Sequence, residues 1–293
     1  QLQWFGPPGP RDMVDRHHRT VPPLVCDGRL FIPGNNRVIG VDVYNGSLLW
    51  NVEVADSRRI GALRDSGSMV AAEDYLYVVA RDRCYGLNAR TGASEHNFAA
   101  PLSAEGQTRF WGYVARVGTR LYGSTTRPGA SRTEHSRKTI DETYYDHIPI
   151  VTSDALFARH RHSGALLWQY RPTRGAILNP TITLAANHLF FVESDDPATL
   201  ATETGRSPLP VLLKNGATLV AIHAETGALV WKTRIDLRSI QHHLYLCYAS
   251  GHLIAVGTRN QGQGKEARVW YDVHCHSAHD GSQQWTTTQN QQQ

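Results

Sequence analysis

The chain is poor in the features that mark membrane-spanning, redox-active or nucleic-acid-binding proteins. No apolar run approaches the roughly 18 residues that a membrane-spanning helix needs, which excludes a membrane span. The 4 cysteines lie far apart and form no Cys-x-x-Cys pair, so they leave the redox compartment open. The net charge is only +4 and the basic residues are scattered, so nothing indicates a nucleic-acid partner.

The sequence also lacks the common catalytic motifs. It contains no Gly-x-Ser-x-Gly, no His-Glu-x-x-His and no phosphate-binding loop. Its 15 histidines include two alternating pairs, His160 with His162 and His274 with His276, and alternate residues of a strand share one face. A lone pair is weak evidence for a metal, and His223 is expected to hydrogen bond within a turn. We therefore predict no metal site.

The chain does contain one eleven-residue stretch that occurs five times. The copies read GVDVYNGSLLW at 40–50, GLNARTGASEH at 86–96, ARHRHSGALLW at 158–168, AIHAETGALVW at 221–231 and CHSAHDGSQQW at 275–285. The turn glycines are Gly46, Gly92, Gly164, Gly227 and Gly281, and the residues four positions later are Trp50, His96, Trp168, Trp231 and Trp285. Recurring self-similarity of this kind indicates a repeat fold.

Each copy lies between two runs in which apolar and polar residues alternate. In the first copy Asn45-Gly46 separates the runs, which is a strong hairpin signal. A second hairpin precedes every copy, so each repeat has four short strands. Tandem four-stranded units are typical of propeller blades. A barrel or sandwich also has many short strands, but the constant glycine-to-aromatic spacing favours an all-β propeller of four-stranded antiparallel blades.

The stretch resembles the tryptophan-docking motif of quinoprotein-type propellers, A-x-D-x-x-T-G-x-x-x-W, the repeat named after pyrroloquinoline quinone (PQQ). This PQQ-like family includes quinoprotein dehydrogenases and BamB-like outer-membrane assembly propellers, and the resemblance covers residues 22–287. Asp42 matches the acidic position, whereas Asn88, His160, His223 and Ser277 depart from it. The resemblance implies that the indoles pack between adjacent blades, which gives structural roles to Trp50, Trp168, Trp231 and Trp285.

The same resemblance sets the expected domain organisation. Its propellers usually have seven or eight blades, so we expect the five recognisable repeats to be part of a larger propeller, one that is periplasmic or exported. The chain itself shows no signal-like segment. We expect an irregular lead-in over 1–21, one propeller domain over 22–287 and a disordered tail over 288–293. The expected blades are 22–54, 67–99, 111–171, 179–235 and 244–287.

Two long insertions separate the second and third strands of their blades. They cover 124–154 in the third blade and 195–217 in the fourth. In an antiparallel blade these loops emerge on the same face as the connection into the first strand. Insertions on one face of a repeat protein often mark a binding face. The alternative is that long loops are merely tolerated, because extra length costs little entropy.

Residues just before each first strand are expected to converge on the mouth of the propeller axis. Arginine and histidine there would attract an anion through focused charge and bidentate contacts. Ordinary solvated or hydrogen-bonded loop residues are the alternative. The candidates are His18, Arg19, Arg64, Asp65, Arg109, Trp111, Arg174, Asn179, His242 and His243.

Three functions are compatible with this pattern. The first is a non-catalytic scaffold, BamB-like in architecture, that docks a protein or an anionic small molecule through its loop-rich face. The second is a PQQ- and calcium-dependent dehydrogenase that oxidises an alcohol or sugar, although the family's vicinal cysteine pair, metal-ligand set and Cys-x-x-Cys-His haem motif are not found. The third is a carbohydrate-binding module in which Trp111, Tyr144 and Tyr145 stack on sugars. Because the ligand motifs are missing, the sequence favours the first, with no catalytic residue and no assigned cofactor.

Overall fold

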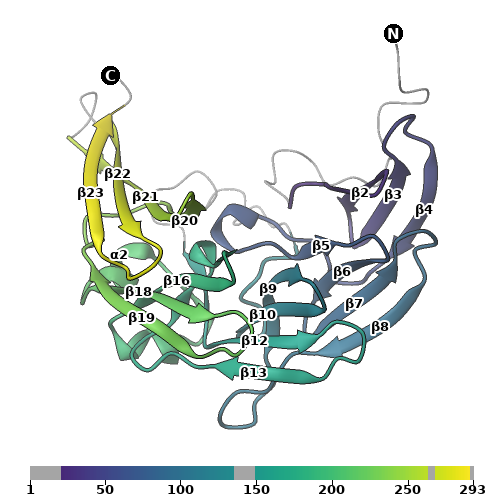
Figure 1. Cartoon of the computed structure of the whole chain (residues 1–293), viewed down its shortest axis with the longest axis horizontal. Coiled ribbons are helices and arrows are strands. Elements are labelled where there is room, and N and C mark those ends of the chain that lie inside the picture. Colours follow the sequence, from purple (N-terminus) through teal and green to yellow (C-terminus); the bar gives the residue numbers. More distant parts are fainter. Residues whose placement is uncertain (1–20, 135–148, 263–267, 291–293) are drawn as a thin grey trace. The chain divides into compact units, whose positions relative to one another are not determined.

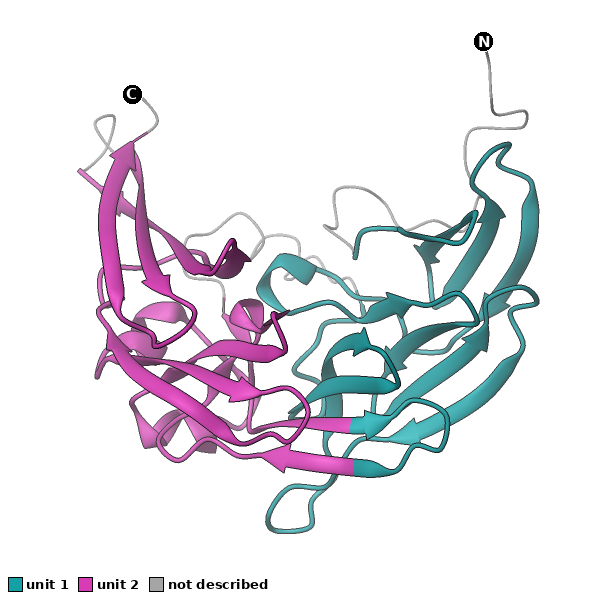
Figure 2. Ribbon diagram, viewed as in Figure 1, with its two compact units in different colours: residues 1–136, 159–166 teal, residues 137–158, 167–293 magenta. Residues whose placement is uncertain are grey.

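The computed structural model describes residues 21–134, 149–262 and 268–290, and these are mostly β-strand (Figure 1). The chain divides into two compact units, Gln1–Ser136 with Arg159–Leu166 and Arg137–Ala158 with Leu167–Gln293 (Figure 2). None of the helices in the described part of the chain has the length and apolar character needed to span a bilayer. The predicted fold class, an all-β protein of four-stranded antiparallel blades, is confirmed.

Unit 1 contains two complete blades and the first hairpin of a third. The sheets have the strand orders β1-β2-β3-β4 and β5-β6-β7-β8, with β9 paired to β10. The elements are β1 (Leu24–Cys26), β2 (Arg29–Gly34), β3 (Arg37–Asp42), β4 (Leu48–Glu53), η2 (Ala62–Arg64), β5 (Met69–Ala71), β6 (Tyr75–Ala80), β7 (Arg83–Asn88), β8 (Ser94–Ala99), β9 (Phe110–Val117) and β10 (Arg120–Thr126). Strands β12 (Ala155–His160) and β13 (Leu166–Tyr170), which complete the third blade in the order β13-β12-β10-β9, have residues in both units.

Unit 2 contains the fourth and fifth blades and several added elements. The sheets have the orders β17-β11-β14-β16-β18-β19, with β15 also on β16, and β20-β21-β22-β23. The elements are β11 (Ile150–Ser153), β14 (Ile177–Leu178), η3 (Asn179–Thr181), β15 (Thr183–Ala185), β16 (His188–Ser194), η4 (Pro197–Ala201), β17 (Arg206–Ser207), α2 (Leu209–Leu213), β18 (Ala217–His223), β19 (Leu229–Ile235), β20 (Leu244–Ala249), β21 (His252–Gln261), β22 (Arg268–Ser277) and β23 (Gln283–Asn290).

The end of β23 corrects one expectation. Residues 288–290, expected in a disordered tail, continue the strand to Asn290, which pairs with Trp270 of β22. The hydroxyl of Thr288 also donates to Asp272 Oδ1 at 2.8 Å. Because the long partner strand supplies backbone and side-chain acceptors, a polar sequence is held in the sheet. Residues 291–293 and most of the lead-in 1–21 lie outside the described residues.

Three indoles join consecutive blades in the same way. Trp50 Nε1 donates to the carbonyl of Ala89 at 3.0 Å, and its ring covers Gly92, where an added Cβ would lie 2.9 Å from Trp50 Cδ2. Trp168 donates to Ala224 at 2.9 Å and Trp231 to Ala278 at 3.2 Å. In each joint the acceptor lies three residues before the turn glycine. We call this arrangement a docking joint.

The second blade has His96 in place of the tryptophan, and two other side chains make its contacts. The hydroxyl of Tyr77 donates to the carbonyl of Arg161 at 3.1 Å, and Arg161 lies three residues before Gly164. The ring of Phe98 covers that glycine, because a Cβ on Gly164 would lie 2.3 Å from Phe98 Cδ1. Tyr77 therefore supplies the hydrogen bond of the missing indole, and Phe98 supplies its packing.

Replacing Tyr77 by phenylalanine is expected to destabilise unit 1 by about 1 kcal/mol, the usual loss for one intramolecular hydrogen bond. Tyr77 is fully buried, and this burial raises the pKa of its phenol to about 12, so the hydroxyl stays protonated as a donor. The matched control is Tyr75→Phe, because the Tyr75 hydroxyl donates to the exposed carboxylate of Glu95. Urea denaturation should show a clearly larger loss for Tyr77→Phe; equal losses would contradict the assignment.

Candidate functional site

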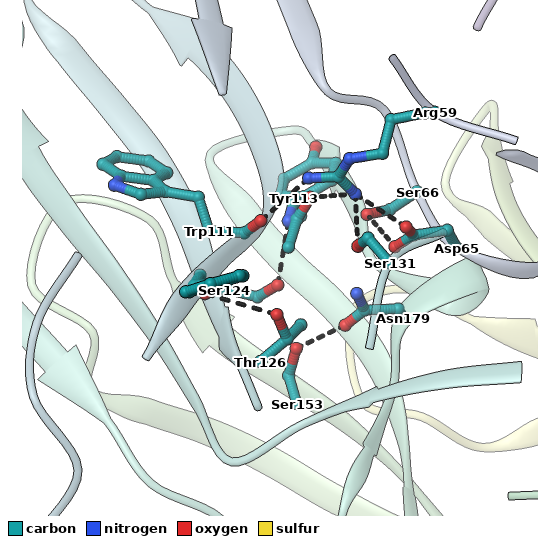
Figure 3. Close-up of polar contacts among 12 residues, drawn as sticks. Arg59, Asp65, Ser66, Trp111, Tyr113, Ser124, Thr126, Ser131, Ser153 and Asn179 are labelled. Atoms are coloured by element: carbon teal, nitrogen blue, oxygen red, sulfur yellow. Dashed lines mark hydrogen bonds and ion pairs between the residues drawn. The ribbon is translucent and has the colours of Figure 1, made fainter. Parts of the chain in front are cut away.

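A buried arginine organises the first candidate cluster, in unit 1. Arg59 lies between β4 and η2, and its guanidinium donates to Asp65 Oδ2 at 2.6 Å, Ser131 Oγ at 2.7 Å and the carbonyl of Trp111 at 2.9 Å (Figure 3). Both charged side chains of the Arg59–Asp65 pair are almost completely buried. The sequence analysis missed Arg59; the signal was a pair of arginines, Arg58-Arg59, in the connection that leads to the second blade.

The described candidates of unit 1 lie at or just before the start of the second and third blades. Asp65 and the carbonyl of Trp111 both accept hydrogen bonds from Arg59. Arg64 and Arg109 are also buried, and they lie close to these two residues in the sequence. The Arg109 guanidinium donates to Gln107 Oε1 at 3.3 Å and to the carbonyl of Thr108 at 3.2 Å. Trp111 is 0% exposed, so its indole cannot stack on a sugar, which corrects the carbohydrate-binding hypothesis at this residue.

A small pocket in unit 1 has three arginines in its wall. Arg37, Arg58 and Arg59 line it together with Val21 and Met69. Each guanidinium donates to the protein: Arg37 to Asn51 Oδ1, Arg58 to the carbonyl of Thr133 and Arg59 to Asp65. The positive charge at this pocket is therefore partly engaged by internal acceptors, which reduces its availability for an anion.

The predicted candidates of unit 2 have separate environments. Asn179 accepts a hydrogen bond from the hydroxyl of Ser153 and is buried. The Arg174 side chain is 56% exposed and lies 3.9 Å from the buried carboxylate of Asp195. His242 is buried, and the ring of His243 stacks on Tyr245. The ten candidates are thus divided between two units, with His18 and Arg19 outside the described residues, and a single ring of charge stays a prediction.

The second part of the third blade's insertion and the insertion of the fourth blade fold into a structured layer in unit 2. Strand β11, from the insertion of the third blade, pairs with β14 on one side and with β17, from the insertion of the fourth blade, on the other. The amide and hydroxyl of Thr152 both donate to the carbonyl of Gly205, at 3.0 and 3.1 Å, and Arg206 donates to the carbonyl of Pro149 at 2.7 Å. We call β11, β14, β17, η4 and α2 the insertion layer.

The insertion layer shares the core of unit 2. Ile150, Leu209, Leu212 and Leu213 are buried in one cluster with Leu178 and other residues of the fourth and fifth blades. The hydroxyl of Ser194, at the end of β16, donates to the carbonyl of Leu212 at 2.6 Å. Val211 of α2 points the other way and is 51% exposed. The sequence predicted the position of these insertions but not their common fold.

The first part of the third blade's insertion, up to Ser136, belongs to unit 1. Ile60 forms a backbone bridge with Arg132, and Arg58 Nε donates to the carbonyl of Thr133. These contacts place the start of the insertion beside the connection into the second blade, as the antiparallel blade geometry predicts. Residues 135–148, with Lys138, Tyr144 and Tyr145, lie outside the described residues.

Two further buried acids, both missed by the sequence analysis, are held by named donors. Glu193 accepts from the hydroxyl of Tyr170 at 2.6 Å and from Lys232 Nζ at 3.3 Å. Asp272 lies 2.7 Å from Arg259 Nε. Burial by itself would raise the pKa of Asp272. Hydrogen bonds from Arg259, Thr288 and Ser239 together have the larger opposite effect, so the pKa of Asp272 is below the usual range. Both acids are engaged as structural groups.

The histidines at the motif's acidic position keep its turn hydrogen bond. Asp42 Oδ1 accepts from the amide of Tyr44 at 2.9 Å, and His160 Nδ1 accepts from Ser163 at 3.2 Å. His223 Nδ1 accepts from the amide of Glu225 at 3.3 Å. Across the described ranges there is no group of three or more His, Cys, Asp or Glu residues arranged to hold a metal.

This donor set does not fit a PQQ–calcium centre. The family's centre uses several carboxylates and an asparagine around the ion, as the resemblance implies. The carboxylate of Asp65 is ion-paired to Arg59, and Asn179 Oδ1 accepts a hydrogen bond from Ser153. The oxygens that would bind the ion are therefore engaged within the protein.

A known family model matches most of the chain, which supports the fold. The family model described as outer membrane protein assembly factor BamB matches residues 13–124 and 158–293. Comparison with curated protein sequences found no match.

Similar solved structures include proteins of different activity. BamB from Moraxella catarrhalis is 12% identical with a TM-score of 0.53, over 92% of this chain and 63% of that one. A quinohemoprotein alcohol dehydrogenase from Pseudomonas putida HK5 is 12% identical with a TM-score of 0.52, over 90% and 41%. Hydrazine synthase from Kuenenia stuttgartiensis is 10% identical with a TM-score of 0.54, over 90% and 62%. The chain spans less than two thirds of each, and identities this low show the fold alone.

Proposed function

The chain belongs to the family described as outer membrane protein assembly factor BamB, and from that premise we propose that it is a non-catalytic scaffold. In this proposal it docks a protein partner through the insertion layer. The family description names the outer membrane, which supports a periplasmic or exported location. One of the similar structures is itself a BamB, and this supports a protein as the partner.

The observation that carries the proposal is the common fold of the two insertions. A loop that is merely tolerated needs no packing of its own. Here segments more than 50 residues apart form adjacent strands, with Ile150 pairing with Ser207, and α2 buries three leucines in the core. A structured surface limits the conformational entropy lost on binding, so it is suited to docking.

The exposed side of α2 presents one apolar side chain among polar neighbours in the sequence. Val211 is exposed on α2 and is surrounded in sequence by exposed Glu203, Thr204 and Lys214. An apolar contact within a polar rim is the usual anatomy of a transient protein interface. An anionic ligand has less support, because the arginines of unit 1 donate to internal acceptors.

Photo-crosslinking in the native host tests the proposal. A photoreactive amino acid at Val211 or Lys214 should capture one common protein, while the same group at Gln284, exposed on β23, should not. The variant Val211→Asp should bind that protein about tenfold more weakly, a typical loss for a central contact, without loss of folding. Capture of the same protein from all three positions, or unchanged binding by Val211→Asp, would overturn the docking assignment.

A separate experiment tests the non-catalytic part of the proposal. Purified protein is titrated with PQQ in the presence and absence of calcium, with dye-linked oxidation of alcohols and sugars as the readout. We expect no saturable binding at micromolar PQQ and no turnover. Calcium-dependent binding with turnover would replace the scaffold by a quinoprotein dehydrogenase.

A further inference from the structure

Two of the five motif turns are closed by an imidazole nitrogen. His160 Nδ1 accepts a hydrogen bond from the amide of Ser163 at 3.2 Å. His223 Nδ1 accepts one from the amide of Glu225 at 3.3 Å. A backbone amide can only donate, so Nδ1 of each ring must carry no proton, and the neutral imidazole holds its hydrogen on Nε2. These two hydrogen bonds therefore exist only while His160 and His223 are uncharged.

The other three motif turns have acceptors that keep their protonation state near neutral pH. The acceptors are Asp42 Oδ1, Asn88 Oδ1 and Ser277 Oγ, at 2.9, 3.0 and 3.2 Å from the amide two residues further on. Amides and hydroxyls do not titrate in this range, and an aspartate carboxylate ordinarily titrates at about pH 4. Imidazole is the side chain that ordinarily changes its charge between about pH 5 and 8. Of the five turns, those at His160 and His223 can thus lose their acceptor by protonation.

The same two turns carry contacts between neighbouring blades. Arg161 follows His160 directly, and its carbonyl accepts the hydrogen bond from the hydroxyl of Tyr77 at 3.1 Å. Ala224 follows His223 directly, and its carbonyl accepts the hydrogen bond from Trp168 Nε1 at 2.9 Å. A change in either turn is therefore passed on to the adjacent carbonyl and to the side chain of the blade that is docked on it.

The surroundings of His160 in unit 1 oppose additional positive charge. The ring centroid of His162 lies 5.8 Å from that of His160 and 6.0 Å from that of His96. Desolvation and, after it, the charge of Arg161 lower the pKa of His162. Arg161 is itself paired with Asp74 at 2.6 Å. The other charged or titratable groups at this turn are Arg159, Tyr75 and Glu95. Imidazoles this close repel one another when they are charged, so acidification acts against the closed turn.

The surroundings of His223 in unit 2 contain a second imidazole. The ring centroid of His188, on the neighbouring strand β16, lies 5.7 Å from that of His223. The side chain of Glu225 belongs to the same turn and is exposed. His188 is bonded in the opposite sense, because its Nδ1 lies 2.7 Å from the carbonyl of Ala186, which can only accept. His188 therefore donates through Nδ1, and a second proton on its Nε2 leaves that bond intact.

We propose that the turns at His160 and His223 form a pH-responsive element of the chain. A proton on Nδ1 breaks the turn hydrogen bond and loosens the contact that the next residue makes with the neighbouring blade. The unfolded chain lacks this hydrogen bond and takes up the proton more readily, so stability falls as the pH falls through the range in which imidazoles titrate. The lowered pKa of His162 acts in the same direction. This role is independent of the insertion layer and of its partner.

Urea denaturation of the full chain at about pH 7.5 and pH 5 tests the proposal with asparagine variants. Asparagine keeps an acceptor for the turn amide, as Asn88 does in the second blade, but it does not titrate. Acidification should raise the unfolding equilibrium constant of the wild type about fivefold for each broken turn, the equivalent of one hydrogen bond. His160→Asn should remove this part of the pH dependence from unit 1, and His223→Asn should remove it from unit 2. At pH 7.5 both variants should be about as stable as the wild type.

The matched control is His252→Asn. Nδ1 of this exposed histidine lies 3.0 Å from the carbonyl of Ser250, so His252 donates there and its protonation leaves the bond intact. The control variant should therefore keep the pH dependence of the wild type.

Amide hydrogen exchange of the wild type gives a second readout that is local to the turns. The protection factors of the Ser163 and Glu225 amides should fall about fivefold between pH 7.5 and pH 5. Those of Tyr44 and Arg90 should change little, because their acceptors do not titrate in this range. Unchanged protection at Ser163 and Glu225, the same pH dependence in the wild type and the two asparagine variants, or an equal loss of pH dependence in His252→Asn would each overturn the proposal.

Discussion

Replacing Gly227 by alanine is expected to destabilise unit 2 by about 3 kcal/mol, because two costs coincide at this turn. Gly227 has a φ of +71°, a left-handed conformation that costs an L-residue about 1 to 2 kcal/mol. The new Cβ would also lie 2.6 Å from Cδ2 of the docked Trp168, and overpacking of this kind costs about 1 to 3 kcal/mol.

Gly251 provides the matched control. It is a turn glycine of the same unit with a φ of +82°, and an added Cβ would meet nothing within 4 Å. Gly251→Ala should therefore lose only the backbone part, about 1 kcal/mol. Urea denaturation followed by circular dichroism measures both. Equal losses for the two variants would mean that Trp168 can move aside and that the docking joint is loose.

A double variant separates the steric part from the backbone part. Trp168→Ala removes the ring that the new methyl group would meet, as well as the hydrogen bond to Ala224. In the Trp168→Ala background, Gly227→Ala should lose no more than Gly251→Ala does, so the two changes at the joint should be strongly non-additive. Additive losses would contradict direct contact as the cause.

The repeat predicted most of the fold because its signals are local. The turn at Asn45-Gly46 and the strand pattern around it depend only on neighbouring residues, and the structure has β3 and β4 where they indicate. The third motif position also tolerates His160 for Asp42, since either side chain accepts the turn amide. Local hydrogen-bonding chemistry of this kind can be deduced from the sequence.

The missed features depend on partners that are distant along the chain. His96 gave no indication that Tyr77 and Phe98 make the contacts of an indole, since this requires the register of β6 and β8 against the next repeat. The polar end of β23 is a strand only because β22 is equally long. The insertion layer likewise depends on the pairing of β11 with β17.

Charge is a signal whose outcome depends on packing. The sequence predicted Asp65 and its neighbours as part of a ring at the axis mouth, because residues just before each first strand are expected to converge there. In the structure Asp65 is buried against Arg59, an arginine that the repeat pattern does not single out. A carboxylate and a guanidinium 6 residues apart can pair in many ways, and only the packing of Ser131 and Trp111 selects this one.

Replacing Arg59 by alanine is accordingly expected to destabilise unit 1 by about 3 to 5 kcal/mol. The substitution leaves the Asp65 carboxylate in a buried site without its cation, and it also removes donors to Ser131 and to the Trp111 carbonyl. An uncompensated buried charge is one of the few changes that produce a loss of this size. The measurement is urea denaturation, with near-ultraviolet circular dichroism to report the environment of Trp111.

Two comparisons decide whether the charge is the cause. Arg238→Ala removes an arginine that pairs with Asp236 at 2.8 Å on the exposed surface, so its effect should be much smaller. The double variant Arg59→Met with Asp65→Leu removes both charges and should recover most of the stability, since a buried ion pair replaced by apolar residues is often neutral. If the double variant is as unstable as Arg59→Ala, the loss lies in the contacts to Ser131 and Trp111. In that case the guanidinium stabilises unit 1 mainly through hydrogen bonds that link the connection into the second blade with the start of the third.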